Sequence, residues 1–246
     1  MTAALELSQI VGKHGQLQAI KGMSLRLDKG EVAAIIGANG AGKTTLMRMI
    51  AGLHPCAEGS IALFGSDVTA MPAHGRLKAG IALSPEGRRL FGDMTVQENL
   101  MIAAENGRRG DWNLATVCDA FSQITPLLGR PAGGLSGGQR QAVAIARALI
   151  ANPDVLLLDE VSLGLSPVAV DGVYQSLETL RGTMTMIVVE QDLTRAMKFA
   201  GRVICMAEGV LELDGAPKDL TRAQITDAYF GIHKTADTTS GGAAHA

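Results

Sequence analysis

The stretch EVAAIIGANGAGKTTLMRMIAGL, residues 31–53, decides the fold. It begins with an apolar run typical of a buried strand and continues into a full G-x-x-x-x-G-K-[ST] motif at residues 37–44. After the motif, apolar residues recur with the period of an amphipathic helix, at Leu46, Met49, Ile50 and Leu53. A strand, a glycine-rich loop and a helix in this order predict a phosphate-binding loop.

The chemistry of phosphate binding explains the residue types in this loop. Glycines let the backbone curl around an anion, so that N–H groups and the helix N-terminus point at the phosphates. Lys43 is then expected to reach the β- and γ-phosphates, Thr44 to ligate Mg²⁺, and Thr45 to contact the α-phosphate. The alternative is a chance glycine-rich turn, expected in about one per cent of such chains. The predicted nucleotide-binding residues are Gly37, Ala38, Asn39, Gly40, Ala41, Gly42, Lys43, Thr44 and Thr45.

The composition limits the class of protein. A chain of 246 residues, 47% hydrophobic and 19% charged, can form one large globular domain or a core with a subdomain. The net charge of −2 and the isolation of the arginine pairs at 88–89 and 108–109 argue against nucleic acid as a partner. The cysteines lack C-x-x-C spacing, which fits a reduced cytosolic setting. We expect neither a secretory signal nor a membrane helix, which needs roughly 18 uninterrupted apolar residues.

Further apolar runs predict an α/β fold, a P-loop NTPase core with a mainly parallel sheet. The runs that predict parallel strands, besides the one before the loop, are Val155–Leu158, Met184–Val189 and Arg202–Met206. The first segments are nearer to alternation and predict an N-terminal antiparallel β subdomain, at Leu5–Val11, Met23–Leu27 and Ser60–Phe64. Helix formers then take over, so we expect a helical subdomain over about residues 90–150. The small and polar residues 235–246 predict a disordered tail.

Two acids follow one of these strands. In PDVLLLDE the apolar run Val155–Leu158 leads into Asp159 and Glu160. Adjacent carboxylates at the end of a buried strand are costly to desolvate unless a cation is near. Beside a phosphate loop, Asp159 is expected to hold Mg²⁺ and Glu160 to act as the general base that polarises the attacking water. The alternative, a solvated loop edge, would be favoured for the two acids alone.

A second glycine-rich stretch, LSGGQ at residues 135–139, opens a helix with an apolar face. A serine and glycines at a helix start make another anion-binding concavity. Because the chain already has one phosphate loop, this stretch would contact a nucleotide held by another subunit. The alternative is an N-cap with flexible glycines. The residues added to the nucleotide-binding set are Ser136, Gly137, Gly138 and Gln139.

GANGAGKT, LSGGQ and VLLLDE, in this order and spacing, resemble the ATP-binding subunits of ABC transporters over about residues 5–231. The resemblance implies a single ATPase domain that uses ATP and Mg²⁺. It also implies a head-to-tail dimer in which ATP lies between the phosphate loop of one subunit and the LSGGQ of the other. In that family ATP closes the pair, hydrolysis and product release reopen it, and this motion drives a conformational change in a membrane partner.

A narrower resemblance comes from LSPEGRRLFGDMTVQENL and AYFG, which are similar to the second of the two ATPase subunits of branched-chain amino acid importers. It implies a second ATPase subunit, two transmembrane permeases and, indirectly, a periplasmic solute-binding protein as partners. The chain would then be peripheral on the cytoplasmic face of the inner membrane. Importers for urea or other amides, a lipopolysaccharide-type exporter, a non-transport ABC ATPase and a soluble P-loop kinase are the alternatives at this point.

The resemblance also assigns roles to residues that depart from the usual ABC pattern. Glu86 occupies the place of the Q-loop glutamine, where its carboxylate could ligate Mg²⁺ or a water bound to it. His14 occupies the place of the aromatic residue that stacks on adenine, with a surface histidine as the alternative. Gln191, in VVEQD, occupies the place of the switch histidine, with a polar strand cap as the alternative. Because Gln exchanges no proton near neutral pH, we expect it to sense the γ-phosphate and position water.

The expected roles can be grouped by chemistry. The predicted catalytic residues are Glu160, Gln191 and Lys43. The predicted metal ligands are Thr44, Asp159 and Glu86.

Overall fold

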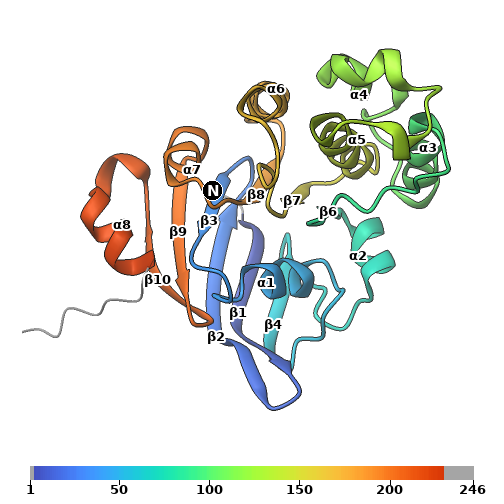
Figure 1. The fold of residues 1–246 in the computed structure, drawn as a ribbon. Helices are drawn as coiled ribbons and strands as arrows, with labels where there is room; N and C mark the ends of the chain where they lie inside the picture. Colours follow the sequence, from blue (N-terminus) through green and yellow to red (C-terminus); the bar gives the residue numbers. More distant parts are fainter. Residues whose placement is uncertain (1–2, 230–246) are drawn as a thin grey trace, which may run out of the picture.

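A computed structural model describes residues 3–229, which form two β-sheets with helices packed around them (Figure 1). The predicted tail, residues 235–246, lies outside the described residues. The first sheet is antiparallel, in the order β2-β1-β4-β5. Its strands are β1 (Ala3–His14), β2 (Leu17–Asp28), β4 (Glu58–Leu63) and β5 (Ser66–Asp67).

The second sheet has the order β10-β9-β3-β8-β7-β6 and is parallel from β9 to β6. Only β10 runs antiparallel to its neighbour. The strands are β3 (Val32–Ile36), β6 (Ile81–Ser84), β7 (Val155–Leu158), β8 (Thr185–Val189), β9 (Arg202–Ala207) and β10 (Val210–Gly215). The predicted α/β class, with a mainly parallel sheet and an antiparallel β subdomain, is confirmed.

The parallel sheet is buried on both faces, which explains why its strands are continuously apolar. On β3, Val32, Ala34 and Ile36 face a core that also contains residues of α5, α6 and α7. The alternate residues Ala33 and Ile35 face a second core, shared with α1 and the antiparallel sheet. Figure 1 shows the two layers, with α5, α6 and α7 on one side of the parallel sheet and α1 on the other.

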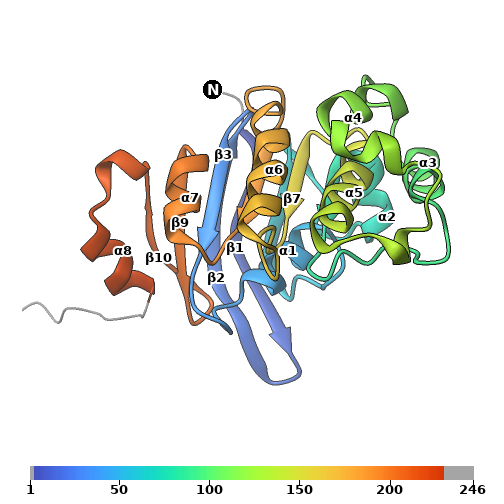
Figure 2. The ribbon, with the colours of Figure 1, turned by 45° about the horizontal axis from the view of Figure 1, so that its top comes forward.

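The helices occupy distinct places around the sheets. Figure 2 shows α3, α4 and α5 together at one end of the molecule and α8 at the other. No helix within residues 3–229 is long and apolar enough to cross a membrane. The helices are α1 (Lys43–Ile50), α2 (Ala73–Ala79), α3 (Val96–Asn106), α4 (Leu114–Ala120), α5 (Gly137–Leu149), α6 (Pro167–Glu178), α7 (Leu193–Phe199) and α8 (Arg222–Tyr229). Short 3₁₀ segments lie at Ser122–Leu127, Ala132–Gly134 and Pro217–Asp219.

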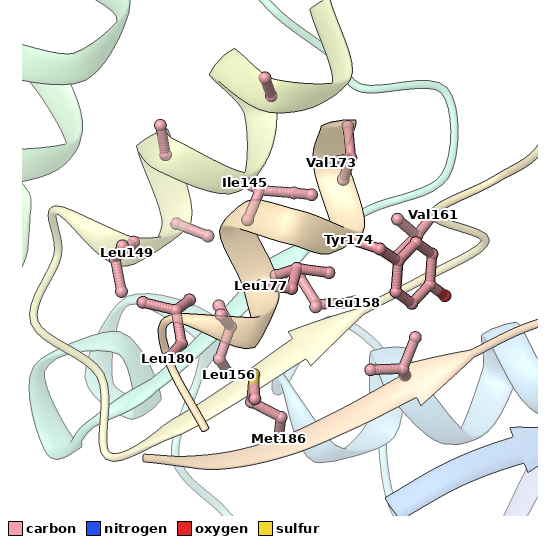
Figure 3. Close-up of a cluster of buried hydrophobic side chains, with 14 of the residues drawn as sticks. Ile145, Leu149, Leu156, Leu158, Val161, Val173, Tyr174, Leu177, Leu180 and Met186 are labelled. Carbon is pink, nitrogen blue, oxygen red and sulfur yellow. The ribbon is translucent and has the colours of Figure 1, made fainter. Parts of the chain in front are cut away.

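Helices α5 and α6 hold the ends of the central strands in place. Figure 3 shows Leu177 of α6 packed against Leu158 of β7, with Ile145 of α5 beside them. These side chains are fully buried, as is Met186 of β8. Since a tightly packed core resists small displacements, the loops that leave β7 and β8 start from fixed positions.

One expectation about the helix after the phosphate loop is wrong. Leu53 was predicted on its apolar face, but α1 ends at Ile50 and the Leu53 side chain is exposed. Gly52 has φ +74, a left-handed conformation that ends helices. The N–H of Leu53 then turns back to the carbonyl oxygen of Arg48 at 2.8 Å, so the chain leaves the helical path one turn early.

Candidate active site

The carboxyl ends of β3, β7 and β8 bring the predicted motifs together. The phosphate loop follows β3, Asp159 and Glu160 follow β7, and Gln191 lies just beyond β8. In an open parallel sheet these ends meet at one edge, which is where such folds bind ligands. A pocket of about 570 Å³ opens there. It is lined by His14, Leu17, Ala19, Asn39, Gly40, Gly42, Lys43, Thr44, Thr45, Glu86, Glu160, Leu163 and Gln191.

Two glycines allow the phosphate loop to adopt its shape. Gly37 has φ +152, and a Cβ there would lie 2.1 Å from the carbonyl oxygen of Met206 on β9. Gly42 has φ +102, and its Cβ would lie 2.6 Å from the carbonyl oxygen of Ala19. Any side chain would therefore collide with backbone that cannot yield, and the loop requires glycine at both positions.

Lys43 is the cation of the loop and is 5% exposed. Its Nζ donates to the carbonyl oxygens of Gly37 at 2.6 Å and Ala38 at 2.9 Å. Burial lowers the pKa of the Lys43 ammonium, while the negative charges of Glu160 and Asp159 act against that decrease. An ammonium has three N–H donors, so the loop carbonyls orient Lys43 and leave a donor for a phosphate oxygen.

Asp159 and Thr44 fit a magnesium ion. Asp159 is 3% exposed, and its Oδ1 has no hydrogen-bond partner within the described part of the chain. Burial, together with the nearby charges of Glu160 and Glu86, raises the pKa of Asp159 to about 6, although a hydrogen bond with Thr44 acts in the opposite direction. A buried carboxylate oxygen without a partner, beside a hydroxyl, is a donor set suited to a hard cation.

Glu86 lines the same pocket and acts on Asp159 through its charge, so its predicted place near the ion fits the geometry. Residues 3–229 contain no cluster of three or more His, Cys, Asp or Glu placed to hold a metal. The ion would therefore be held by Thr44, Asp159 and Glu86 together with substrate oxygens and water, as is usual for Mg²⁺. When bound, Mg²⁺ neutralises charge on the β- and γ-phosphates.

Glu160 and Gln191, which are 31 residues apart, meet at the mouth of the pocket. The Gln191 Nε2 donates to the Glu160 Oε1 at 3.1 Å. Glu160 has φ +52, a left-handed conformation that a residue with a side chain adopts only where its surroundings hold it. The sharp turn after β7 therefore presents the Glu160 carboxylate to the pocket, and the amide of Gln191 orients it.

A buried acid that was not predicted from the sequence stabilises this turn. Glu190 is 1% exposed and accepts hydrogen bonds from the Ser162 hydroxyl at 2.6 Å and from the Tyr174 hydroxyl on α6. Figure 3 shows Tyr174 beside Val161, in the turn that follows β7. Glu190, which directly precedes Gln191, thus connects the end of β8 to the Ser162 turn and to α6. The signal in the sequence was an acid placed directly after an uninterrupted apolar strand.

His14 lies at the predicted adenine side of the pocket, but its ring has neighbours of its own. Its Nε2 is 3.1 Å from the Thr45 hydroxyl, and its ring lies 4.5 Å from that of His54, tilted by 45°. His54 is half-buried. Stacking of His14 on adenine stays a prediction, as does the α-phosphate contact of Thr45.

The LSGGQ segment does not contribute to this pocket. Ser136 caps α5 in a reciprocal capping box with Gln139: the Gln139 N–H donates to the Ser136 Oγ at 3.3 Å, and the Ser136 N–H donates to the Gln139 Oε1 at 2.9 Å. Gly138 has a packing role, since a Cβ there would lie 2.6 Å from the Ala169 side chain. Ser136 therefore serves as an N-cap in this structure, and contact of the segment with a nucleotide held by another subunit stays a prediction.

A glycine-rich phosphate loop, a buried Asp at the ion position and a Glu poised by an amide, all at one edge of a parallel sheet, define a P-loop nucleoside triphosphatase. The family described as ABC transporter matches residues 20–162, more than half of the chain. The protein belongs to the ABC transporter family, as an ATP-binding cassette that hydrolyses ATP to power transport.

Individual relatives agree with this assignment. The high-affinity branched-chain amino acid transport ATP-binding protein BraG of Pseudomonas aeruginosa is 36% identical over 231 residues, covering 92% of this chain and 99% of BraG. BraF of the same organism, also described as a high-affinity branched-chain amino acid transport ATP-binding protein, is 28% identical over 248 residues, covering 92% of this chain and 97% of BraF.

Solved structures agree as well. The ATP-binding cassette MJ1267 of an ABC transporter is 27% identical with a TM-score of 0.81, covering 93% of this chain and 99% of MJ1267. The ADP conformation of MJ1267 has a TM-score of 0.78 at 27% identity, over 94% of this chain and 100% of MJ1267.

Proposed function

We propose that this chain is the ATP-hydrolysing subunit of an importer for branched-chain amino acids, peripheral on the cytoplasmic face of the inner membrane. The observation that carries the proposal is the similarity to BraG along almost the whole of both chains. Identity to BraG is 36% and to BraF 28%, which supports a role as the BraG-like member of a pair of unlike ATPase subunits. Two permeases and a periplasmic solute-binding protein would complete the importer.

The site supports a division of labour in hydrolysis. Lys43 binds the β- and γ-phosphates, and Thr44, Asp159 and Glu86 hold Mg²⁺. Glu160 accepts a proton from the water that attacks the γ-phosphorus, while Gln191 orients the Glu160 carboxylate and the water. The bond to the leaving ADP oxygen breaks as the new P–O bond forms, which gives ADP and inorganic phosphate.

A head-to-tail dimer is part of the proposal. The LSGGQ segment lies outside the pocket formed by its own phosphate loop, so a second subunit is needed to bring the two together. Near these elements the large side chains of Leu163 and Val168 are 44% and 83% exposed, as expected of residues that a partner covers. The partner ATPase would be the BraF-like subunit in the importer.

The proposal is tested first with Glu160→Gln. This substitution keeps the shape of the side chain and removes its basicity, so ATP binding should be retained and turnover should fall by about 10²- to 10⁴-fold. ATP should then trap a dimer that size-exclusion chromatography detects. Lys43→Ala serves as the control, because this variant should bind ATP weakly. Turnover close to that of the unchanged protein would contradict the role of Glu160.

The solute is tested separately. The chain should co-purify with two permease subunits and a second ATPase, and proteoliposomes containing that complex should take up leucine when ATP is enclosed. Uptake of urea but not leucine would support the related amide importer instead. Recovery with ribosomes or DNA would contradict a transport role.

A further inference from the structure

The loop after Glu86 has an unusual backbone. Gly87, Arg88 and Arg89 have φ values of +76, +64 and +44, so three successive residues are left-handed. Residues with side chains adopt this conformation only where surrounding contacts hold it. Arg147 of α5 supplies such contacts, donating to the carbonyl oxygens of Arg89 at 2.9 Å and Arg88 at 3.2 Å. The loop is therefore anchored to the helix that begins with LSGGQ.

The side chain of Arg88 connects three parts of the molecule. Its Nε donates to the Gln141 Oε1 on α5 at 2.9 Å, and its Nη2 donates to the carbonyl oxygen of Leu163 at 3.0 Å. Gln141 lies one turn into α5, after LSGGQ, and is 3% exposed. Leu163 lies in the turn after Glu160. Arg88 itself is two residues from Glu86, which lines the nucleotide pocket.

A guanidinium is suited to this position. Its N–H donors diverge in a rigid plane, so that one side chain can hold two acceptors at a fixed separation, which a lysine ammonium cannot do. The partners of Arg88 lie 53 and 75 residues away along the chain. A shift of the loop at Glu86 would consequently be transmitted to α5 and to the Leu163 turn together.

We propose that Arg88 is a positioning residue that couples nucleotide binding in the pocket of one subunit to the surface that engages the nucleotide of the other. The inference rests on the proposed head-to-tail dimer, in which LSGGQ and the turn after Glu160 face the partner. Glu86 would change position when the pocket is occupied, and Arg88 would then align both of these elements for dimer closure. Nucleotide binding to one subunit thereby changes the surface that this subunit presents to its partner.

The experiment compares Arg88→Ala with Arg89→Ala, both made in the Glu160→Gln chain so that ATP is not consumed. Arg89 is the matched control because it is adjacent, left-handed and exposed, and only its backbone carbonyl enters the contacts described above. Binding of a fluorescent ATP analogue to the monomer, and the ATP concentration that gives half-maximal dimer, are measured for each variant.

Arg88→Ala should bind nucleotide within about twofold of the Glu160→Gln chain, because Arg88 does not line the pocket. It should need at least about tenfold more ATP to dimerise, since two charge-assisted hydrogen bonds are lost. Arg88→Lys should behave more like Arg88→Ala, and Arg89→Ala should behave like the Glu160→Gln chain. This separation of monomer binding from dimer closure would not arise from a merely structural role.

Two variants of Gln141 keep the test decisive if Arg88→Ala does not fold. Gln141→Glu retains an acceptor for Arg88 and should dimerise normally, while Gln141→Leu should show part of the defect. If Arg88→Ala or Gln141→Leu dimerises as readily as the Glu160→Gln chain, the inference is overturned while the proposed dimer stands. If the Glu160→Gln chain itself forms no dimer with ATP, the proposed dimer and the inference both fail.

Discussion

Replacing Asp159 by Asn should stabilise the nucleotide-free protein while destroying its use of Mg²⁺. The Asp159 side chain is 3% exposed, and its Oδ1 has no hydrogen-bond partner among the described residues. Burial, with the charges of Glu160 and Glu86, raises the pKa of Asp159 from 3.8 to about 6. A pKa difference of this size between the folded and unfolded states corresponds to about 3 kcal/mol of folding free energy.

The direction of the pH effect follows from the raised pKa. The folded chain binds the Asp159 proton more tightly than the unfolded chain does. The stability that this protonated carboxyl contributes is therefore full below about pH 4 and is lost as the pH rises through about 6. Asn carries no charge at any of these pH values. The free energy of unfolding of the Asn variant, relative to the unchanged protein, should therefore increase by about 2 to 3 kcal/mol between about pH 4 and pH 7.

Urea unfolding at both pH values, without Mg²⁺ or nucleotide, measures this difference. Comparing two proteins at each pH cancels the other titrating groups, which they share. Asp119→Asn is the control, since Asp119 is exposed on α4 and its replacement should change neither value. Adding MgCl₂ and ATP should raise the melting temperature of the unchanged protein and leave that of Asp159→Asn nearly unaffected.

A relative stability that stays constant between the two pH values would refute the reasoning. It would mean that the Asp159 carboxylate is solvated or paired in the folded protein and carries no desolvation cost. Equal stabilisation of both proteins by MgCl₂ with ATP would refute the separate claim that Asp159 holds the ion.

Four further substitutions test other parts of the site. Lys43→Ala should weaken ATP binding, measured by calorimetry, by roughly 10- to 100-fold because charged hydrogen bonds to phosphate are lost, and unchanged affinity would contradict the phosphate-loop assignment. Gln191→Ala should lower kcat by about tenfold with little change in KM for ATP, because only the orientation of Glu160 and of water is affected; unaltered hydrolysis would exclude the sensing role and leave the family assignment intact. Glu190→Gln should also lower kcat, by about tenfold, while Tyr174→Phe, which leaves the bond from Ser162 to Glu190, should have a smaller effect; equal and normal rates in both would show that Glu190 does not position the turn.

Features that depend on neighbours in the sequence could be predicted from it. The apolar run Met184–Val189 predicts a strand, and β8 is found at Thr185–Val189. The prediction works because a sheet covered on both faces requires uninterrupted apolar strands. The phosphate loop could also be predicted, since a side chain at Gly37 or Gly42 would collide with the backbone. Local rules failed at the end of α1, where Gly52 stopped the helix before Leu53.

Contacts between distant segments could not be predicted in this way. Glu190 meets Ser162 and Tyr174 only because β8 lies beside β7 and α6 packs over both. The two bonds of Arg88 likewise depend on how the Glu86 loop, α5 and the turn after β7 are arranged in space. No spacing in the sequence encodes these partners, although a buried acid at a strand end, such as Glu190, signals that partners must exist.

The pairing of Glu160 with Gln191 changes how the pH dependence of this ATPase should be interpreted. A histidine at residue 191 would gain charge near neutral pH and alter its bond to Glu160, so that turnover would follow its titration. An amide keeps the same N–H donor at every pH, so residue 191 itself adds no titration to the bond with Glu160. Asp159, with its pKa raised to about 6, changes charge just below neutrality. Because a metal ligand must be deprotonated, we expect protonation of Asp159 to weaken binding of the Mg²⁺ ion that this residue is proposed to hold.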